Sequence, residues 1–390
     1  MQFTPLNKQA RAEWRGMLNP TDGAHLGAAA ALFLLSAIAL PLSRVEAVAG
    51  LYLIYAVVFY YMLTHSLASI LAIALPGALL FGASALAPGL PHPYLMPAVY
   101  TALVLGGVGG GFLMIHCREK KHLAFLALPV AAYAIVAVSE GPLQGLFVLI
   151  PVALSLVLGH AMLTCRPQTP VLITTAAVLA LAGVVTYLVW YALSGWPVPN
   201  PLAYLGDLVG DGVERVFRDA QATLAEMGEE MPGEIDAFAI AAVLGNALIG
   251  FFLAGCGILS FLIFRTYLRV LTAWGTLSRV PLRVGAMTVS PIAAVLFLFS
   301  FLVSLFVPQS MAGAVCDNLS LVLQPALVLV GVSSLFAREH ERHSVLSTLL
   351  LLGMLMLLFY NFMLAFTAAA FLGAFRVLMA AIMTRKKDNK

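Results

Sequence analysis

The stretch AFAIAAVLGNALIGFFLAGCGILSFLIF, residues 237–264, decides the fold class of this chain. It contains no charged side chain, and Asn246 is its only amide residue. A helix that crosses a bilayer needs about 20 predominantly apolar residues, and this stretch exceeds that length. We therefore predict a transmembrane helix over residues 237–264.

The rest of the chain has the same character. Of its 390 residues, 62% are hydrophobic and 10% are charged, whereas soluble domains have about 45–50% apolar and about 25% charged residues. We predict an all-α, polytopic transmembrane helix bundle with about 11–12 membrane segments and one extracytoplasmic amphipathic helix. The other apolar runs are 24–43, 47–64, 66–88, 95–116, 123–138, 143–164, 171–193, 284–308, 317–336 and the long stretch 344–375.

The basic residues give the orientation, because loops rich in Lys and Arg stay in the cytoplasm during insertion. With the N-terminus inside, only Arg44, Arg215 and Arg218 of the 21 basic residues fall outside, which leaves 18 on the cytoplasmic side. The acids show the opposite bias, with 12 of the 18 outside. The predicted location is the bacterial cytoplasmic (inner) membrane, with both termini in the cytoplasm.

One long segment is not a membrane span. In residues 195–236, apolar residues recur at steps of three and four from Leu202 to Met231, which is the α-helical period. The same segment carries nine acids and two arginines. The pattern predicts an acidic amphipathic helix on the outer surface, either a lid or docking surface or a helix that rests on the bundle.

These boundaries divide the chain into four parts. We expect a cytoplasmic segment (1–23), an N-terminal membrane half of about seven spans (24–193), the extracytoplasmic helix (194–236), and a C-terminal membrane half with a basic loop and tail (237–390). The stretch 344–375 has basic residues on both sides and is too long for one ordinary span. A hairpin or re-entrant pair that turns near Tyr360-Asn361 satisfies both observations, although a single long helix over 344–385 stays open.

Asn246 is the best candidate for a ligand contact, together with Gly245 and Gly250. An amide inside an apolar helix must find a hydrogen-bonding partner, which is either a ligand or a neighbouring helix. The glycines at 106, 107, 109, 110 and 111 raise a similar choice. They favour close helix packing or a broken helix that lines a cavity.

The stretch from Arg265 to Arg283 holds four arginines and no acid. It is suited to a cytoplasmic partner or to anionic headgroups, and the alternative is that its charges only fix the topology. The candidate docking residues are Arg265, Arg269, Arg279 and Arg283.

The chain lacks the motifs of most catalytic and metal sites. It has no P-loop and no GxSxG sequence, and its four cysteines form no CxxC pair. The two histidines of Glu339–His343 are three apart, whereas a zinc helix of the HExxH type requires a spacing of four. No charged residue falls in the middle of a predicted span. We expect no enzyme activity, metal, cofactor or nucleic-acid partner, and no self-sufficient ion-driven transport.

Several features resemble the YybS-like family of uncharacterised bacterial polytopic membrane proteins. They are the entry into the first span (Thr21–Ala29), the acidic external helix, Val280-Pro281 in the basic loop, the segment Gln324–Gly331, and the basic end Arg385–Lys387. The likeness extends over nearly the whole chain, but the family pattern is not kept at Phe371–Arg376.

The N-terminal half of that family is distantly similar to the S subunits of energy-coupling-factor vitamin transporters and to rod-shape scaffolds. In S subunits, small residues of the first span dock on a transmembrane partner, which implies this role for Ala24, Gly27, Ala28 and Ala31. One hypothesis is therefore a small-molecule binding or permease component that depends on an ATPase-coupled partner. The other is a membrane scaffold that binds envelope or cell-division proteins.

Overall fold

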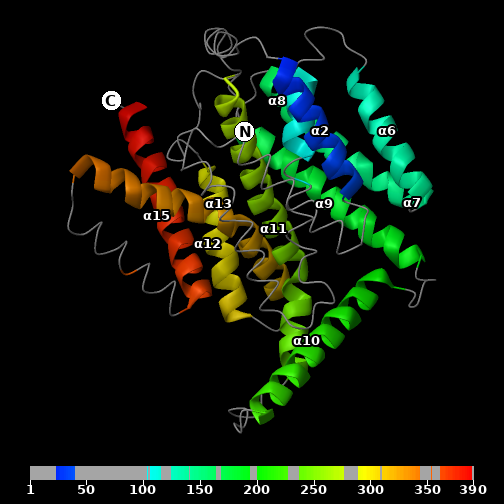
Figure 1. The fold of residues 1–390 in the computed structure, drawn as a ribbon. Coiled ribbons are helices and arrows are strands. Elements are labelled where there is room, and N and C mark those ends of the chain that lie inside the picture. Colours follow the sequence, from blue (N-terminus) through cyan, green and yellow to red (C-terminus); the bar gives the residue numbers. More distant parts are fainter. Residues whose placement is uncertain are drawn as a thin grey trace. The chain divides into compact units, whose positions relative to one another are not determined.

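The part of the chain that the structure describes is almost entirely helical (Figure 1). The computed structural model describes residues 23–39, 103, 106–115, 124–139, 141–163, 168–193, 200–226, 237–275, 289–307, 310–342, 353 and 361–388. None of these residues lies in a β-strand. The predicted all-α class is thereby confirmed.

Four of the described helices contain stretches that are long and apolar enough to cross a bilayer, which agrees with the predicted polytopic membrane architecture. These stretches are Gln168–Val189, Gly245–Ala273, Met311–Ser333 and Leu364–Met383. Shorter apolar helices include Gly106–Ile115, Ala127–Ser139, Leu146–Met162 and Pro291–Phe306. The predicted runs 47–64 and 66–88 lie outside the described residues, as does the first part of 344–375.

The chain divides into two compact units. Unit 1 comprises Met1–Ala241 and Leu259–Val280, and unit 2 comprises Ala242–Ile258 and Pro281–Lys390. The long helix α11 (Ala237–Ala273) contributes residues to both units. Each unit is described by itself below.

Unit 1 contains most of the shorter apolar helices together with both ends of α11, whose middle part (Ala242–Ile258) belongs to unit 2. Its first described helix, α2 (Gly23–Ala39), buries Leu32 and Phe33. The remaining described elements of the unit are the helical segment 106–115, α6 (Ala124–Ser139), α7 (Pro142–Gly145), the 3₁₀ turn η1 (Leu146–Val148), α8 (Leu149–Leu163), α9 (Gln168–Leu193) and α10 (Pro201–Glu226).

The glycine-rich segment 106–115 packs against three helices, and Figure 1 shows it among α2 and α8. A Cβ at Gly109 would lie 2.7 Å from the main-chain oxygen of Ala29 in α2. A Cβ at Gly106 would lie 2.7 Å from the Cβ of Pro151 in α8, and one at Gly111 would lie 3.0 Å from the Tyr267 ring in α11. The glycines therefore serve close helix packing, which is the first of the two interpretations given above.

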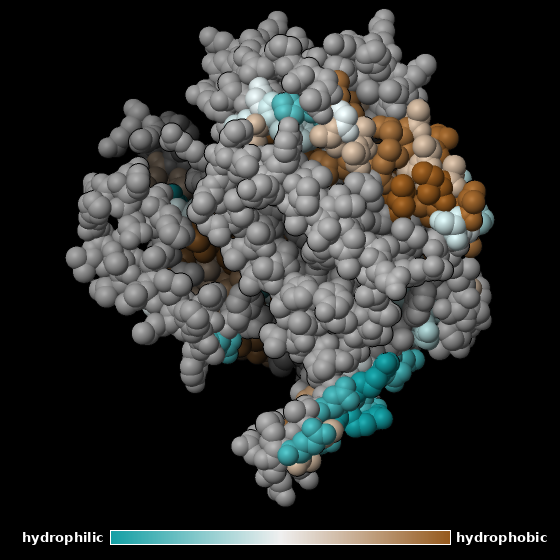
Figure 2. Space-filling view, in the orientation of Figure 1, coloured by the Kyte–Doolittle hydropathy of each residue, from teal (hydrophilic) through white to brown (hydrophobic). Residues whose placement is uncertain are grey.

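Helix α10 confirms the amphipathic helix over its described part. The carboxylate residues are exposed, whereas Leu205, Val209 and Phe217 are half-buried. The polar face of α10 is visible in Figure 2 as a hydrophilic strip. The Tyr187 hydroxyl of α9 donates a hydrogen bond to the main-chain oxygen of Pro201, which ties the start of α10 to the end of α9. The exposed acids are Asp207, Asp211, Glu214, Asp219 and Glu226.

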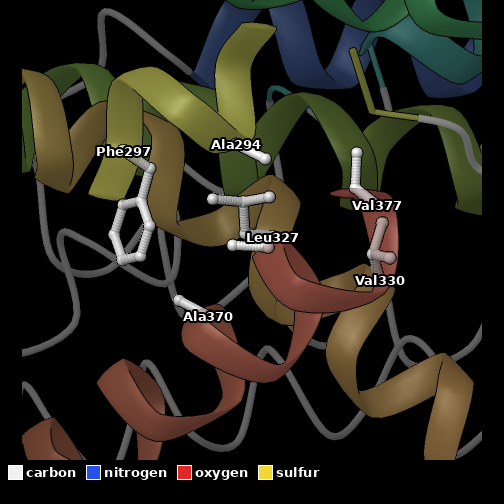
Figure 3. Close-up of a cluster of buried hydrophobic side chains, with 7 residues drawn as sticks. Ala294, Phe297, Leu327, Val330, Ala370 and Val377 are labelled. Carbon is white, nitrogen blue, oxygen red and sulfur yellow. The ribbon is translucent and has the colours of Figure 1, made fainter. Parts of the chain in front are cut away.

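In the described part of unit 2, three helices share one apolar core: α12 (Pro291–Phe306), α13 (Met311–Arg342) and α15 (Phe362–Asp388). Pro291 stands at the first helical position of α12, where a missing N–H costs nothing. The core, seen in Figure 3, contains Ala294, Phe297, Leu327, Val330, Ala370, Ala374 and Val377.

The direction of these helices follows from their connections and contacts. Only residues 307–310 separate α12 from α13, so the two helices are antiparallel neighbours. Helices α13 and α15 run in parallel, because Gln324 contacts Thr367 and, further along both helices, Gly331 meets Gly373. The basic ends of α13 and α15 therefore point the same way, as the predicted topology requires.

The long apolar stretch 344–375 is not one helix. Asn361 is not helical, and its side-chain oxygen accepts a hydrogen bond of 3.1 Å from the N–H of Leu364, as an N-cap does. Helix α15 begins at Phe362 and continues past Arg376 to Asp388. The apolar stretch Leu364–Met383 continues beyond the predicted end of this segment at residue 375 and includes Arg376.

Candidate functional site

The candidate ligand residues of α11 lie beside Asn318 of α13, within unit 2. The Asn318 side-chain nitrogen donates hydrogen bonds to the main-chain oxygen of Asn246, at 2.7 Å, and to that of Ala314, at 2.8 Å. The Asn318 side-chain oxygen accepts a hydrogen bond from the N–H of Gly250. In an uninterrupted α-helix, the carbonyl of residue 246 and the N–H of residue 250 bond to each other. Asn318 therefore engages both members of one backbone pair of α11.

Gly250 makes this approach possible. A Cβ at position 250 would lie 2.8 Å from the Asn318 side-chain oxygen and 2.9 Å from the Asn318 Cα. Gly245 is different, because a Cβ there would meet no atom within 4 Å. Of the two glycines predicted as ligand residues, only Gly250 belongs to this helix contact.

Asn246 takes part through its backbone, whereas its side chain is exposed. The interhelical hydrogen bond considered for this residue is therefore present, but the amide that provides it belongs to Asn318. The exposed Asn246 side chain carries two N–H donors and one oxygen acceptor. Asn318 could have been found by the same criterion as Asn246, since it too is an amide in an apolar helix.

The chemistry available at this junction is that of neutral amides. Both N–H donors of Asn318 are used, and its oxygen accepts one bond. Such a site can orient an uncharged or zwitterionic molecule by hydrogen bonds. A nucleophile or general base would have to come from elsewhere.

Replacing Asn318 with alanine is expected to lower the free energy of unfolding by about 1–2 kcal/mol, because interhelical hydrogen bonds in membranes contribute about 0.6 kcal/mol each. Gly250→Ala should cost about 2 kcal/mol by overpacking. The two losses should not add in the double variant, since both act on one contact. Detergent-titrated unfolding of the four forms measures the coupling, and Gly245→Ala is the control that should change little. Strict additivity would contradict the contact.

The predicted docking residues of α2 lie on two sides of the helix, within unit 1. Gly27 and Ala31 are exposed, and a Cβ at Gly27 would meet no atom within 4 Å. Ala28 is half-buried, and Ala24 is helical, with a side chain outside the described set. Gly27 and Ala31 are four residues apart and therefore share one uncovered face of α2.

The predicted basic docking residues are only partly described. Arg265 and Arg269 lie one turn apart on α11 and are half-buried, while Arg279 and Arg283 fall outside the described residues. Nearby in unit 1, the Trp274 ring stacks on His25 of α2, with ring centroids 5.3 Å apart, and meets Phe112 edge-on at 4.6 Å. Sequence reasoning did not single out this aromatic contact, which fixes the start of α2 against the end of α11.

Comparison with known proteins identifies a family for this chain. A family model with the description "Predicted membrane protein (DUF2232)" matches residues 111–373. This range includes Asn246, Gly250 and Asn318. No curated protein and no solved structure matches the chain.

Proposed function

This chain belongs to the DUF2232 family of predicted membrane proteins, and from that premise we propose that it is the membrane-embedded binding component of a multi-subunit transporter. It binds a small uncharged or zwitterionic molecule and passes it on with the help of a partner that supplies the energy. In this proposal the chain acts as energy-coupling-factor S subunits do, and it carries out no catalytic step.

The uncovered small-residue face of α2 carries this proposal. At Gly106, Gly109 and Gly110, the space left by a missing side chain is filled by another helix of the same chain. At Gly27 the space that a side chain would occupy is open. Ala31, one turn further along α2, is exposed as well. Small residues let two membrane helices approach closely, so this face fits a helix from a transmembrane partner.

The ligand in this proposal is held through the exposed amide of Asn246. Asn318 fixes the backbone of α11 beneath that amide. A rigid backbone under a binding residue reduces the entropy lost when a ligand binds. We place Asn246 toward the extracytoplasmic end of its span and both chain termini in the cytoplasm of a bacterial cell, as the charge distribution favours.

A pair of bulky substitutions on α2 tests the docking step. Gly27→Leu with Ala31→Leu should reduce the recovery of transmembrane and ATPase partners with the affinity-purified chain at least tenfold, because the side chains hold the partner helix away. Ala134→Leu is the matched control, since Ala134 is an exposed alanine on α6. Quantitative mass spectrometry of the purified complexes gives the readout. Equal partner recovery in all three forms would overturn the docking role of α2.

A second candidate function is a scaffold for envelope or cell-division proteins. The observation in its favour is α10, whose exposed acids and half-buried apolar residues form two opposite faces. As a scaffold, the chain would bind envelope proteins through α10 and cytoplasmic proteins through the basic stretch after Arg265.

Native mass spectrometry of the detergent-purified chain separates the two functions. The transport proposal expects a retained vitamin-sized molecule that is lost with Asn246→Ala, together with an ATPase-linked partner. If the chain is a scaffold, it should retain stable envelope partners and no small molecule. Those partners should be lost when Val209 and Phe217 of α10 are changed to serine.

A further inference from the structure

Helix α15 has one face that packs inside unit 2. This face includes four buried residues that are small apart from one valine: Ala370, Gly373, Ala374 and Val377. Figure 3 shows Ala370 and Val377 beside the core residues of α13. Membrane helices pack most closely where their side chains are small, so α15 uses this face for contact with its neighbours.

A second face of α15 is exposed and carries large apolar side chains. Toward the end of the helix these are Phe375, Met379, Ile382 and Met383, each more than half exposed. They lie in the stretch Leu364–Met383, which is long and apolar enough to cross a bilayer. Because lipid tails are as apolar as leucine, large apolar side chains on the outside of such a helix are suited to contact with lipid.

Arg376 lies on this exposed face of α15. Its side chain is exposed, and so are those of Ala380 and Met383, which lie one and two turns further along on the same side of the helix. None of the other residues that the structure describes forms an ion pair with Arg376. A guanidinium at membrane depth is costly without a partner. A negatively charged group from outside the described helices is therefore the expected partner.

The length of α15 places Arg376 below the membrane surface. From Phe362 to Phe375 the helix has 14 residues, or about 21 Å, which is less than a hydrocarbon core of about 30 Å. The next basic residue, Arg385, follows nine residues later in the same helix, about 14 Å further on. With Arg385 in water and a headgroup layer of about 5–8 Å, the backbone of Arg376 lies just inside the hydrocarbon. Its long side chain can extend from there to the lipid phosphates.

We propose that Arg376 binds the phosphate of an anionic phospholipid, whose acyl chains lie along the exposed apolar face of α15. A guanidinium can donate two parallel hydrogen bonds to one phosphate, and its charge attracts a headgroup that is negative overall. An acidic residue on a partner helix is the competing explanation. The size of Phe375, Met379 and Met383 argues against it, because helices that pack closely meet at small residues. The lipid site is independent of the transport and scaffold proposals.

The test uses the full-length chain, freed of lipid in a neutral detergent, with phosphatidylglycerol and phosphatidylcholine of the same acyl chains as the probes. In native mass spectrometry, the wild type should bind one phosphatidylglycerol at least tenfold more tightly than phosphatidylcholine. Arg376→Gln should weaken this binding at least tenfold. Arg376→Lys should give an intermediate affinity, because an ammonium keeps the charge and loses the two-pronged geometry.

The matched control is Arg215→Gln, which removes an exposed arginine of α10 that lies outside the apolar stretches. This variant should bind phosphatidylglycerol as the wild type does. Phosphatidylglycerol should also raise the melting temperature of the wild type and of Arg215→Gln, since a ligand of the folded state stabilises it. The melting temperature of Arg376→Gln should not respond, although its circular dichroism without lipid should match that of the wild type.

Two results would overturn the proposal. The first is equal binding of the two lipids by the wild type, which would mean that no negative headgroup is recognised. The second is phosphatidylglycerol binding that Arg376→Gln leaves unchanged, which would place the lipid on other basic residues. If Arg376→Gln then also loses a membrane protein that co-purifies with the wild type, Arg376 pairs with an acid of a partner helix instead.

Discussion

Gly373→Ala is expected to lower the free energy of unfolding by about 3 kcal/mol, the upper end of the usual range for overpacking a core. A Cβ at position 373 would lie 1.9 Å from the main-chain oxygen of Leu327 and 3.0 Å from the Gly331 nitrogen. These are backbone atoms, which cannot turn aside as the end of a flexible side chain can. The substitution therefore has to push α13 and α15 apart along their whole contact.

The effect can be measured through Cys256, a free cysteine that is 8% exposed in unit 2. In a variant that keeps it as the only cysteine, a thiol-reactive fluorophore reports unfolding during heating. Gly331→Ala should cost a similar amount, because its Cβ would lie 2.1 Å from the Ala369 oxygen. Gly255→Ala is the control, since Gly255 is exposed and has open space around it. Equal melting curves for Gly373→Ala and Gly255→Ala would refute the close crossing.

Gly109→Ala should displace α2 from the glycine-rich segment and cost about 2–3 kcal/mol. The added methyl group would lie 2.7 Å from the Ala29 oxygen and 3.2 Å from the Phe33 nitrogen. Both atoms belong to the backbone of α2, so relief requires movement of the whole helix.

Trp274 gives a local readout for that displacement, because its ring contacts both His25 of α2 and Phe112 of the glycine-rich segment. With Trp274 as the only tryptophan, Gly109→Ala should shift its emission to longer wavelength and increase its quenching by acrylamide. Gly27→Ala, on the uncovered face of the same helix, should leave the emission unchanged. An unchanged spectrum in both variants would mean that α2 does not depend on the glycine contact.

The class of the protein and several helix ends could be predicted from the sequence, because hydrocarbon imposes a length and a composition on every span. The amphipathic helix also followed from the sequence, because apolar residues recur at steps of three and four along 201–226 and so separate from the polar residues onto different faces. The break near Asn361 followed from the length of the stretch 344–375 and from the basic residues on both sides of it. Its cap could have been anticipated as well, because asparagine is a common N-cap residue.

The details of the candidate site could not be predicted in the same way. Asn246 was singled out because it is an amide in an apolar helix. Its hydrogen bond depends on which helix lies beside it, and a single sequence does not show which helices are neighbours. The same holds for Gly250 and Gly245, which look alike in sequence and differ only in what surrounds them. The last apolar segment was predicted to end at residue 375, before the first charge, although a long basic side chain can extend from within a helix to the interface.

Helix α11 has a consequence for how the protein is made. Unit 1 needs residues 259–280 and unit 2 needs residues 242–258, so the ribosome delivers part of the second unit before the first is complete. The Tyr267 ring packs against Gly111, so this side of the glycine-rich segment is covered only after Tyr267 has been synthesised. A chain cut after residue 241 would leave that face bare, and we expect it to be held by membrane chaperones or degraded instead of accumulating.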